Sequence, residues 1–314
     1  MYKRQESILI LVADLGATNA RFCITEDSLS FSHEASYQIN DYESIEKLCW
    51  AYISDKGLNG LNKAVIGVAA PILSDHVSFV NANLEFSIKK LEENLFSEGL
   101  IVVNDLELQA YAIFNLQPED LTYIGRKRLS EGPMILVAPG TGLGLAGIIG
   151  DTVISTEAGH INISDKVLKP DLKKIMDRFI RENKRAPTYE DFLSGKGISY
   201  FYETLSEGSE LCFSNEEILS NRENKHCLQS INLLNYLLSS YLRCVSLVWG
   251  SHGGVLLSGS IVNSLILEED YQQFRDTFED SDTMKNFMQS TPLAIVRIND
   301  IGFAGGLELS KKLQ

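Results

Sequence analysis

The sequence predicts an α/β protein built from two related lobes. Strand-like apolar runs alternate with helical patterns along the 314 residues, and this alternation is typical of α/β folds. The run Ile-Leu-Val-Ala occurs at 10–13 and again at 135–138, and each copy is followed by a Gly/Thr turn and a further strand-like run. Because no long linker separates the two halves, we expect close-packed lobes with a cleft between them.

Hydrophobic periodicity gives the expected elements in order. Strands are expected at 8–13, 20–25, 64–69, 100–103, 134–138, 145–149 and 255–258. Helices are expected at 43–55, 88–96, 106–115, 171–182, 196–205, 229–249 and 302–312. The small lobe should span 1–114 and be completed by the C-terminal helix 302–314, and the large lobe should span 115–301.

One stretch, 232–249, is apolar enough to suggest a membrane span. It contains Arg243, which is costly at the centre of a bilayer, and its apolar residues follow the i, i+3, i+4 pattern of a helix with one buried face. We therefore expect a core helix and no membrane partner.

Composition excludes other classes of protein. With 44% hydrophobic and 22% charged residues, the chain has the make-up of an ordinary soluble globular protein. The net charge is −14 and no run of Lys or Arg forms a basic patch, so nucleic acid is not an expected partner. The five cysteines lack CxxC spacing and lie mostly in apolar runs, which predicts reduced, buried thiols. With no export signal visible, these features predict a cytoplasmic protein.

The first Gly-rich turn is a candidate phosphate-binding turn. A strand ends at Asp14, and a turn then leads into the next strand, so that backbone amides and a Thr hydroxyl can face one phosphate group. Asp14 could hold Mg²⁺ through water, because Mg²⁺ prefers oxygen ligands and keeps part of its hydration shell. A plain hairpin turn is the alternative. The turn residues are Gly16, Ala17, Thr18 and Asn19.

The second Gly-rich turn, within 138–147, contains the spacing GxGxxG at Gly142, Gly144 and Gly147. A strand rather than a helix is expected to follow, which excludes a Rossmann dinucleotide site. A second phosphate-binding hairpin remains, with Thr141 as its hydroxyl donor. Two such hairpins could together clamp a triphosphate.

Three segments carry candidate polar side chains for chemistry. Asp105 follows a buried strand, where α/β folds place their active sites, although Asn104-Asp105 is also typical of a helix N-cap. Glu157 and His160 flank a small turn, and a packed core histidine is the alternative for His160. Glu190 by itself is typical of a helix-surface acid.

Taken in order, the segments resemble the bacterial-type glucokinases of the hexokinase and actin ATPase superfamily. The segments that carry the resemblance are 14–21, 81–87, 104–105, 140–144, 157–160, 190–195 and 253–261. The resemblance implies a two-lobed hexokinase/actin-like (ribonuclease H-like) α/β fold with a central cleft. It also implies ATP-dependent phosphorylation of glucose at the 6-hydroxyl to glucose 6-phosphate, the first step of glycolysis.

The resemblance further implies roles for single residues. Asp105 matches the general base that accepts the proton of the sugar's 6-hydroxyl. ATP and Mg²⁺ are the implied cofactors, with Mg²⁺ held by Asp14 through water, and a homodimer is expected. The implied glucose ligands are Asn81, Asn104, Asp105, Glu157, His160 and Glu190. The implied nucleotide contacts are Asp14, Gly16, Ala17, Thr18, Asn19, Gly140, Thr141, Gly142 and Gly259.

The sequence departs from the family pattern at Ala17 and Ala158, where Gly is usual, and a side chain would reshape those loops if φ is positive there. It also departs at 258–261, where Ser260 stands at a position near the nucleotide that is commonly Gly, and this departure bears on nucleotide preference. No cysteine-rich zinc motif follows His160, so a zinc site is not expected. Two alternatives remain. One is a kinase for another hexose, such as mannose or an N-acetylhexosamine. The other is a non-catalytic sugar-sensing regulator, for which residues 1–7 are too few to form a helix-turn-helix.

Overall fold

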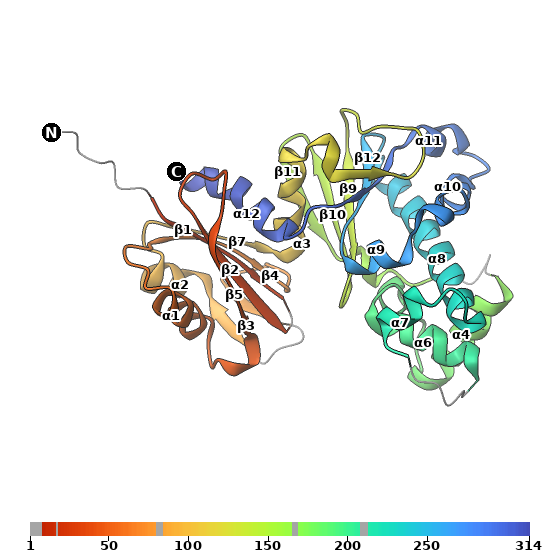
Figure 1. The fold of residues 1–314 in the computed structure, drawn as a ribbon, viewed down its shortest axis with the longest axis horizontal. Coiled ribbons are helices and arrows are strands. Elements are labelled where there is room, and N and C mark those ends of the chain that lie inside the picture. Colours follow the sequence, from red (N-terminus) through yellow and green to blue (C-terminus); the bar gives the residue numbers. More distant parts are fainter. Residues whose placement is uncertain (1–7, 17, 80–83, 165–168, 208–212) are drawn as a thin grey trace. The chain divides into compact units, whose positions relative to one another are not determined.

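The computed structural model describes residues 8–16, 18–79, 84–164, 169–207 and 213–314. The chain divides into two compact units, one ending at Gln117 but including Ile298–Gln314, and the other spanning Pro118–Arg297. Three residues with sequence-based predictions, Ala17, Asn81 and Cys212, lie outside the described residues. Each unit is built on a mixed β-sheet with helices packed against it (Figure 1), as expected for the α/β class.

The first unit contains a five-stranded sheet in the order β3-β2-β1-β4-β7. Strands β1, β2 and β3 pair antiparallel, and β4 and β7 continue from β1 in parallel. The strands are β1 (Ile10–Leu15), β2 (Asn19–Thr25), β3 (Ser32–Gln38), β4 (Lys63–Val68) and β7 (Gly99–Asn104), with a separate small hairpin of β5 (His76–Ser78) and β6 (Glu85–Ser87). The helices are α1 (Ile45–Asp55), α2 (Ile88–Leu95), α3 (Asp105–Tyr111) and α12 (Ile301–Ser310).

Strand β1 is buried along its whole length, because successive side chains enter different packing layers. Leu11, Ala13 and Leu15 belong to the core cluster that also contains the buried side chains of α1. Val12 instead packs with Phe303 of α12. The C-terminal helix therefore covers the opposite face of β1 from α1, and Asp14 lies on the α12 face.

The second unit contains a six-stranded sheet in the order β11-β10-β9-β12-β13-β8. An antiparallel hairpin is again followed by two parallel strands, and β8 adds an antiparallel edge. Both Ile-Leu-Val-Ala runs lie in the corresponding strands, β1 and β9, so the prediction of two halves with similar openings is confirmed. The strands are β8 (Leu121–Tyr123), β9 (Met134–Pro139), β10 (Leu143–Ile149), β11 (Thr152–Thr156), β12 (Gly254–Leu257) and β13 (Leu293–Val296).

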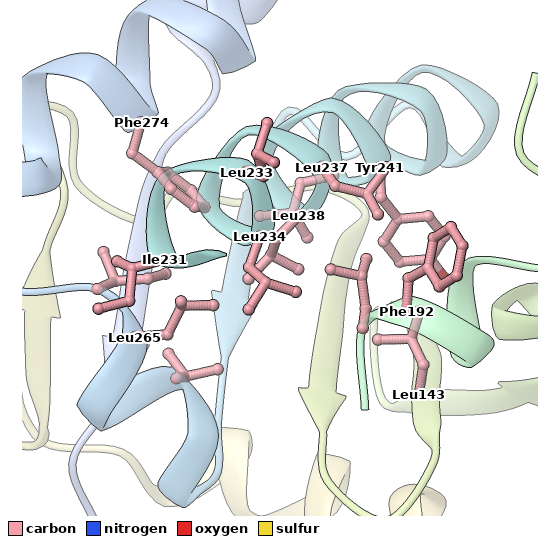
Figure 2. Packing of buried hydrophobic residues seen from close by; sticks show 14 of the residues in the cluster. Leu143, Phe192, Ile231, Leu233, Leu234, Leu237, Leu238, Tyr241, Leu265 and Phe274 are labelled. Atoms are coloured by element: carbon pink, nitrogen blue, oxygen red, sulfur yellow. The ribbon is translucent and has the colours of Figure 1, made fainter. Parts of the chain in front are cut away.

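The long helix α8 (Lys225–Trp249) is the centre of the second unit's helical layer. It is long and apolar enough to cross a membrane by length and composition, but 61% of its most apolar window is buried within the protein. Figure 2 shows side chains of α8 gathered with Leu143 and Phe192 in one apolar cluster. The predicted core helix is thus confirmed. The other helices are α4 (Pro170–Asn183), α5 (Tyr189–Phe192), α6 (Gly195–Ser206), α7 (Asn215–Ser220), α9 (Ser260–Leu265), α10 (Tyr271–Glu279) and α11 (Lys285–Ser290).

Each strand and helix expected from periodicity corresponds to an observed element, with ends displaced by a few residues. One expected helix, 106–115, is α-helical only to Tyr111 and continues as a 3₁₀ turn, Ala112–Asn115. Strand β3 was not expected, because none of its side chains is fully buried and its two alternating half-buried apolar residues, Ala35 and Tyr37, are too few to signal a strand. Helix α5 was not expected as a separate element, since it is only four residues long.

Among the described cysteines, all but one are buried, as the sequence predicts. Cys23, Cys49 and Cys227 are free and buried, and burial raises the pKa of the Cys49 thiol to about 12. Such thiols stay protonated and unreactive near neutral pH. The prediction is wrong for Cys244, which is exposed because it lies on the outer side of α8.

Candidate functional site

The first Gly-rich turn connects β1 to β2 in the first unit. The Gly16 amide donates to the Asn19 carbonyl (3.0 Å), and the Thr18 carbonyl accepts from the amide of Ile39 (2.9 Å). The side chains of Thr18 and Asn19 are exposed. The predicted hairpin is confirmed, and its polar side chains lie at the surface of this unit.

Asp14 lies beside this turn and is held by a residue to which sequence reasoning assigned no role. Arg21, on β2, forms an ion pair with Asp14 and a second with Asp300 (2.9 Å). The Asp14 side chain is only 9% exposed, and Gly302 of α12 packs against it so closely that an added Cβ would lie 2.6 Å from its Oδ2. Arg21 therefore fixes Asp14 beneath the start of α12. Nothing in the local sequence signals this contact, because Asp300 is 279 residues from Arg21.

Asn104 and Asp105 lie at the junction of β7 and α3. Asn104 is the N-cap, since its Oδ1 accepts from the amides of Leu106 (3.0 Å) and Glu107 (3.4 Å). Its Nδ2 donates to the Ala70 carbonyl (3.3 Å). The capping role weighed for the Asn-Asp pair therefore falls to Asn104. Asp105 is the first helical residue and is half-buried, at the carboxyl end of a parallel strand.

In the second unit, Glu157, His160 and Glu190 come together, and we refer to these three residues as the acid cluster. His160 Nε2 lies 3.6 Å from Glu157 Oε2, and His160 Nδ1 lies 3.9 Å from Glu190 Oε1. Glu157 and His160 are exposed, and the Glu190 side chain is 34% exposed. His160 is therefore not the packed core histidine of the alternative interpretation, and Glu190 is not an isolated surface acid.

Backbone contacts hold the two segments of the acid cluster together. A β-bridge joins Asn162 to Thr188, and the Tyr189 amide donates to the Ile161 carbonyl (3.0 Å). Thr188 and Asp191 form a capping box at the start of α5. Burial alone would raise the pKa of Asp191, but hydrogen bonds from Arg185 and Thr188 outweigh it and lower this pKa. The capping box and the backbone contacts thus fix the position of α5, and with it the position of Glu190.

The second Gly-rich turn, residues 140–142, joins β9 to β10 and is called the Gly-rich turn from here. It is closed by the Gly140 amide donating to the Gly142 carbonyl (2.8 Å), and the Gly140 carbonyl accepts from the Gly195 amide (2.9 Å). Thr141 is exposed at its tip. A strand follows, as expected, so this segment lacks the helix of a Rossmann site.

The positions at which the sequence departs from the family pattern are compatible with side chains where they are described. Ala158 begins a 3₁₀ turn, Ala158–His160, and does not have a positive φ. Ser260 is the first residue of α9, and the positive φ of 102° falls on Gly259 before it. Gly259 also lies close to the Gly-rich turn, since an added Cβ would be 3.2 Å from the Pro139 carbonyl oxygen.

No group of three or more His, Cys, Asp or Glu side chains is placed to hold a metal ion within the part of the chain that the structure describes. Asp14 offers a single buried carboxylate, with one oxygen bonded to Arg21. In phosphoryl-transfer sites, Mg²⁺ is bound by one or two carboxylates and by substrate phosphates, and it keeps several waters. Asp14 therefore fits a Mg²⁺ ion that arrives with a nucleotide.

Comparison with known proteins identifies the family. The family model described as Glucokinase matches residues 11–312. The chain belongs to the glucokinase family. It is 30% identical over 326 residues to a glucokinase of Helicobacter acinonychis, covering 96% of each chain, and 29% identical over 306 residues to one of Neisseria gonorrhoeae, covering 94% of this chain and 92% of the relative.

Solved structures of glucokinases share the fold. The glucokinase from Balamuthia mandrillaris in complex with glucose has a TM-score of 0.83 at 20% identity, covering 96% of this chain and 93% of that one. A glucokinase from an Antarctic psychrotroph has a TM-score of 0.78 at 24% identity, covering 97% and 99%. The two-lobed hexokinase-like fold class expected from the sequence is confirmed for this member of the glucokinase family.

The ion pairs of Arg21 generate a stability prediction. Arg21→Gln removes both pairs and leaves the buried Asp14 carboxylate without its cationic partner, so the free energy of unfolding should fall by about 1–3 kcal/mol. Urea denaturation measures the change. The matched control is Lys47→Gln, which removes an exposed ion pair with Glu43 and should lower the free energy of unfolding by much less than Arg21→Gln. Equal losses in the two variants would contradict a fixing role for Arg21.

Proposed function

We propose that this member of the glucokinase family transfers the γ-phosphoryl group of ATP to the 6-hydroxyl of glucose, giving glucose 6-phosphate and ADP. The observation that carries the proposal is the family match over residues 11–312. Within this range, Glu190 of the acid cluster accepts a hydrogen bond from the amide of Leu143, the residue that follows the Gly-rich turn. We infer that the second unit binds both the sugar hydroxyls and the phosphates. The relatives named glucokinase support glucose as the acceptor.

The acid cluster suits a sugar. Carboxylate acceptors form charge-assisted hydrogen bonds with hydroxyl groups, each worth about 1.5–3 kcal/mol. Glu157 and Glu190 present two carboxylates on either side of the His160 imidazole, and a sugar that lacks a matching hydroxyl would leave these groups without a hydrogen bond. We propose that these residues bind ring hydroxyls of glucose, together with Asn104 and with Asn81, which lies outside the described residues.

The Gly-rich turns suit the phosphates of ATP. In the second unit, the exposed Thr141 hydroxyl and the surrounding backbone can contact phosphate oxygens, and in the first unit Thr18 and Asn19 offer the same kind of groups. We propose that Asp14 holds Mg²⁺ through water. When bound, Mg²⁺ neutralises charge on the transferring phosphoryl group.

Asp105 is the proposed general base. As the 6-oxygen forms its bond to the γ-phosphorus and the bond from phosphorus to the β,γ-bridging oxygen breaks, the hydroxyl proton passes to the Asp105 carboxylate. The position of Asp105 at the carboxyl end of β7, half-buried, supports this role. Asn104 is the N-cap of α3, and Asp105 Oδ1 also accepts a hydrogen bond from the Leu106 amide (2.8 Å), which fixes the orientation of the proposed base.

We further propose a cytoplasmic homodimer without nucleic-acid or membrane partners. The net charge of −14 and the buried free thiols support the cytoplasm and argue against a nucleic-acid surface. The homodimer is proposed from the resemblance to the glucokinase family alone.

The proposed activity has a direct test. Purified protein should form ADP from ATP in a coupled assay only when glucose and Mg²⁺ are both present, and EDTA should stop the reaction, because the charge on the transferring group then lacks neutralisation. Mannose and N-acetylglucosamine serve as alternative acceptors. ADP formation that ignores glucose, or that prefers another acceptor, would contradict glucose as the substrate.

A second prediction concerns Asp105. Asp105→Asn keeps the size of the side chain but cannot accept the 6-hydroxyl proton, so kcat should fall by at least ~10²-fold while the glucose KM changes little. The control is Glu107→Gln, which changes the next acidic residue of α3, two positions after Asp105. This change should leave kcat within about twofold of wild type. Near-normal turnover of Asp105→Asn would assign Asp105 a structural role instead.

A further inference from the structure

Glu190 makes two different contacts with its two carboxylate oxygens. Oε1 faces His160 Nδ1 at 3.9 Å, within the acid cluster. Oε2 accepts a hydrogen bond from the backbone amide of Leu143 at 2.9 Å. Leu143 is the first residue of β10 and directly follows the Gly-rich turn. One side chain therefore contacts both the group proposed to bind sugar and the turn proposed to bind phosphate.

The contact between Glu190 and the Leu143 amide requires a glycine at position 142. A Cβ added at Gly142 would lie 2.6 Å from Glu190 Oε2, closer than Cβ atoms come to other atoms in proteins. It would also lie 3.2 Å from the carboxyl carbon of Glu190, which is a tight contact. The φ of Gly142 is not positive, so space rather than backbone conformation explains the glycine. In the same turn, an added Cβ at Gly140 would meet nothing within 4 Å. The absence of a side chain at 142 is thus what admits the carboxylate.

Both ends of the Gly-rich turn are attached to the same short segment. The Gly195 amide donates to the Gly140 carbonyl (2.9 Å) at the start of the turn, and Glu190 accepts from the Leu143 amide at its end. The segment from Glu190 in α5 to Gly195, the first residue of α6, is therefore bonded to both ends of the turn. A shift of the Glu190 carboxylate would act directly on the Leu143 amide and, through it, on the turn.

We propose that Glu190 is a positioning residue for the Gly-rich turn as well as a sugar ligand, so that sugar binding and nucleotide binding are coupled through this one carboxylate. The inference rests on the proposed function. A bound sugar hydroxyl fixes the orientation of Glu190, and the oriented carboxylate fixes the Leu143 amide and the turn beside it. By linkage, a nucleotide that orders the turn must favour the sugar to the same degree.

The first test compares Gly142→Ala with Gly140→Ala by calorimetric titration of glucose into nucleotide-free protein. Both variants add one methyl group to the same turn, but only the methyl at 142 displaces Glu190. The glucose Kd should rise at least about 5-fold in Gly142→Ala and stay within about twofold of wild type in Gly140→Ala. Melting temperatures of both variants report whether each is folded.

The second test measures the coupling itself. Titration of the non-hydrolysable ATP analogue AMPPNP, with and without saturating glucose, should show at least about 5-fold tighter binding with glucose in the wild type. In Glu190→Ala this ratio should fall towards one even at saturating glucose. In Glu157→Ala, which removes the acid on the other side of His160, the ratio should persist once glucose is saturating.

The outcomes separate the two proposals. If wild-type protein does not bind glucose, the proposed function is wrong and the coupling through Glu190 falls with it. If the wild type binds glucose but Gly142→Ala and Gly140→Ala have equal glucose affinities, the coupling alone is overturned. Retention of the wild-type glucose effect on AMPPNP binding by Glu190→Ala would overturn it as well.

Discussion

The close packing around the backbone of Leu143 is the constraint on which the candidate site of the second unit depends. Its amide donates to Glu190, and its carbonyl oxygen would lie 2.3 Å from a Cβ added at Gly159, within the turn that carries His160. Its side chain is buried in the core cluster that contains Phe192 of α5 (Figure 2). A single strand residue thus contacts the Gly-rich turn, the Glu157–His160 segment and α5.

In the first unit, Asp14 is likewise held by close packing at a glycine and by bonds to its carboxylate. Gly302 lets α12 approach the Asp14 carboxylate, and Arg21 bonds Asp14 on one side and Asp300 on the other. The C-terminal segment therefore completes the surroundings of a strand formed near the N-terminus. In both units a glycine permits a close approach to a carboxylate of the candidate site, Asp14 at Gly302 and Glu190 at Gly142, and charged or backbone donors bond that carboxylate.

Much of this architecture can be predicted from local pattern. The two Ile-Leu-Val-Ala strands, their hairpins and helix α8 follow from hydrophobic periodicity, and the family resemblance alone groups Glu157, His160 and Glu190. What local pattern could not give is tertiary contact. The Arg21–Asp300 pair joins residues 279 apart, and the second contact of Glu190 joins residues 47 apart. Strand β3 has only two half-buried apolar side chains, Ala35 and Tyr37, so its pairing with β2 defines it more than its sequence does.

The central claim is that the Glu190 carboxylate holds the Leu143 amide. Hydrogen exchange of that amide, resolved by NMR in wild type and in Glu190→Ala, tests it most directly. Because the amide loses its acceptor, its exchange should accelerate at least about 10-fold in the variant, corresponding to about 1.4 kcal/mol, while the Gly195 amide, which bonds Gly140, keeps its rate. An unchanged exchange rate at Leu143 in a folded Glu190→Ala protein would contradict the claim.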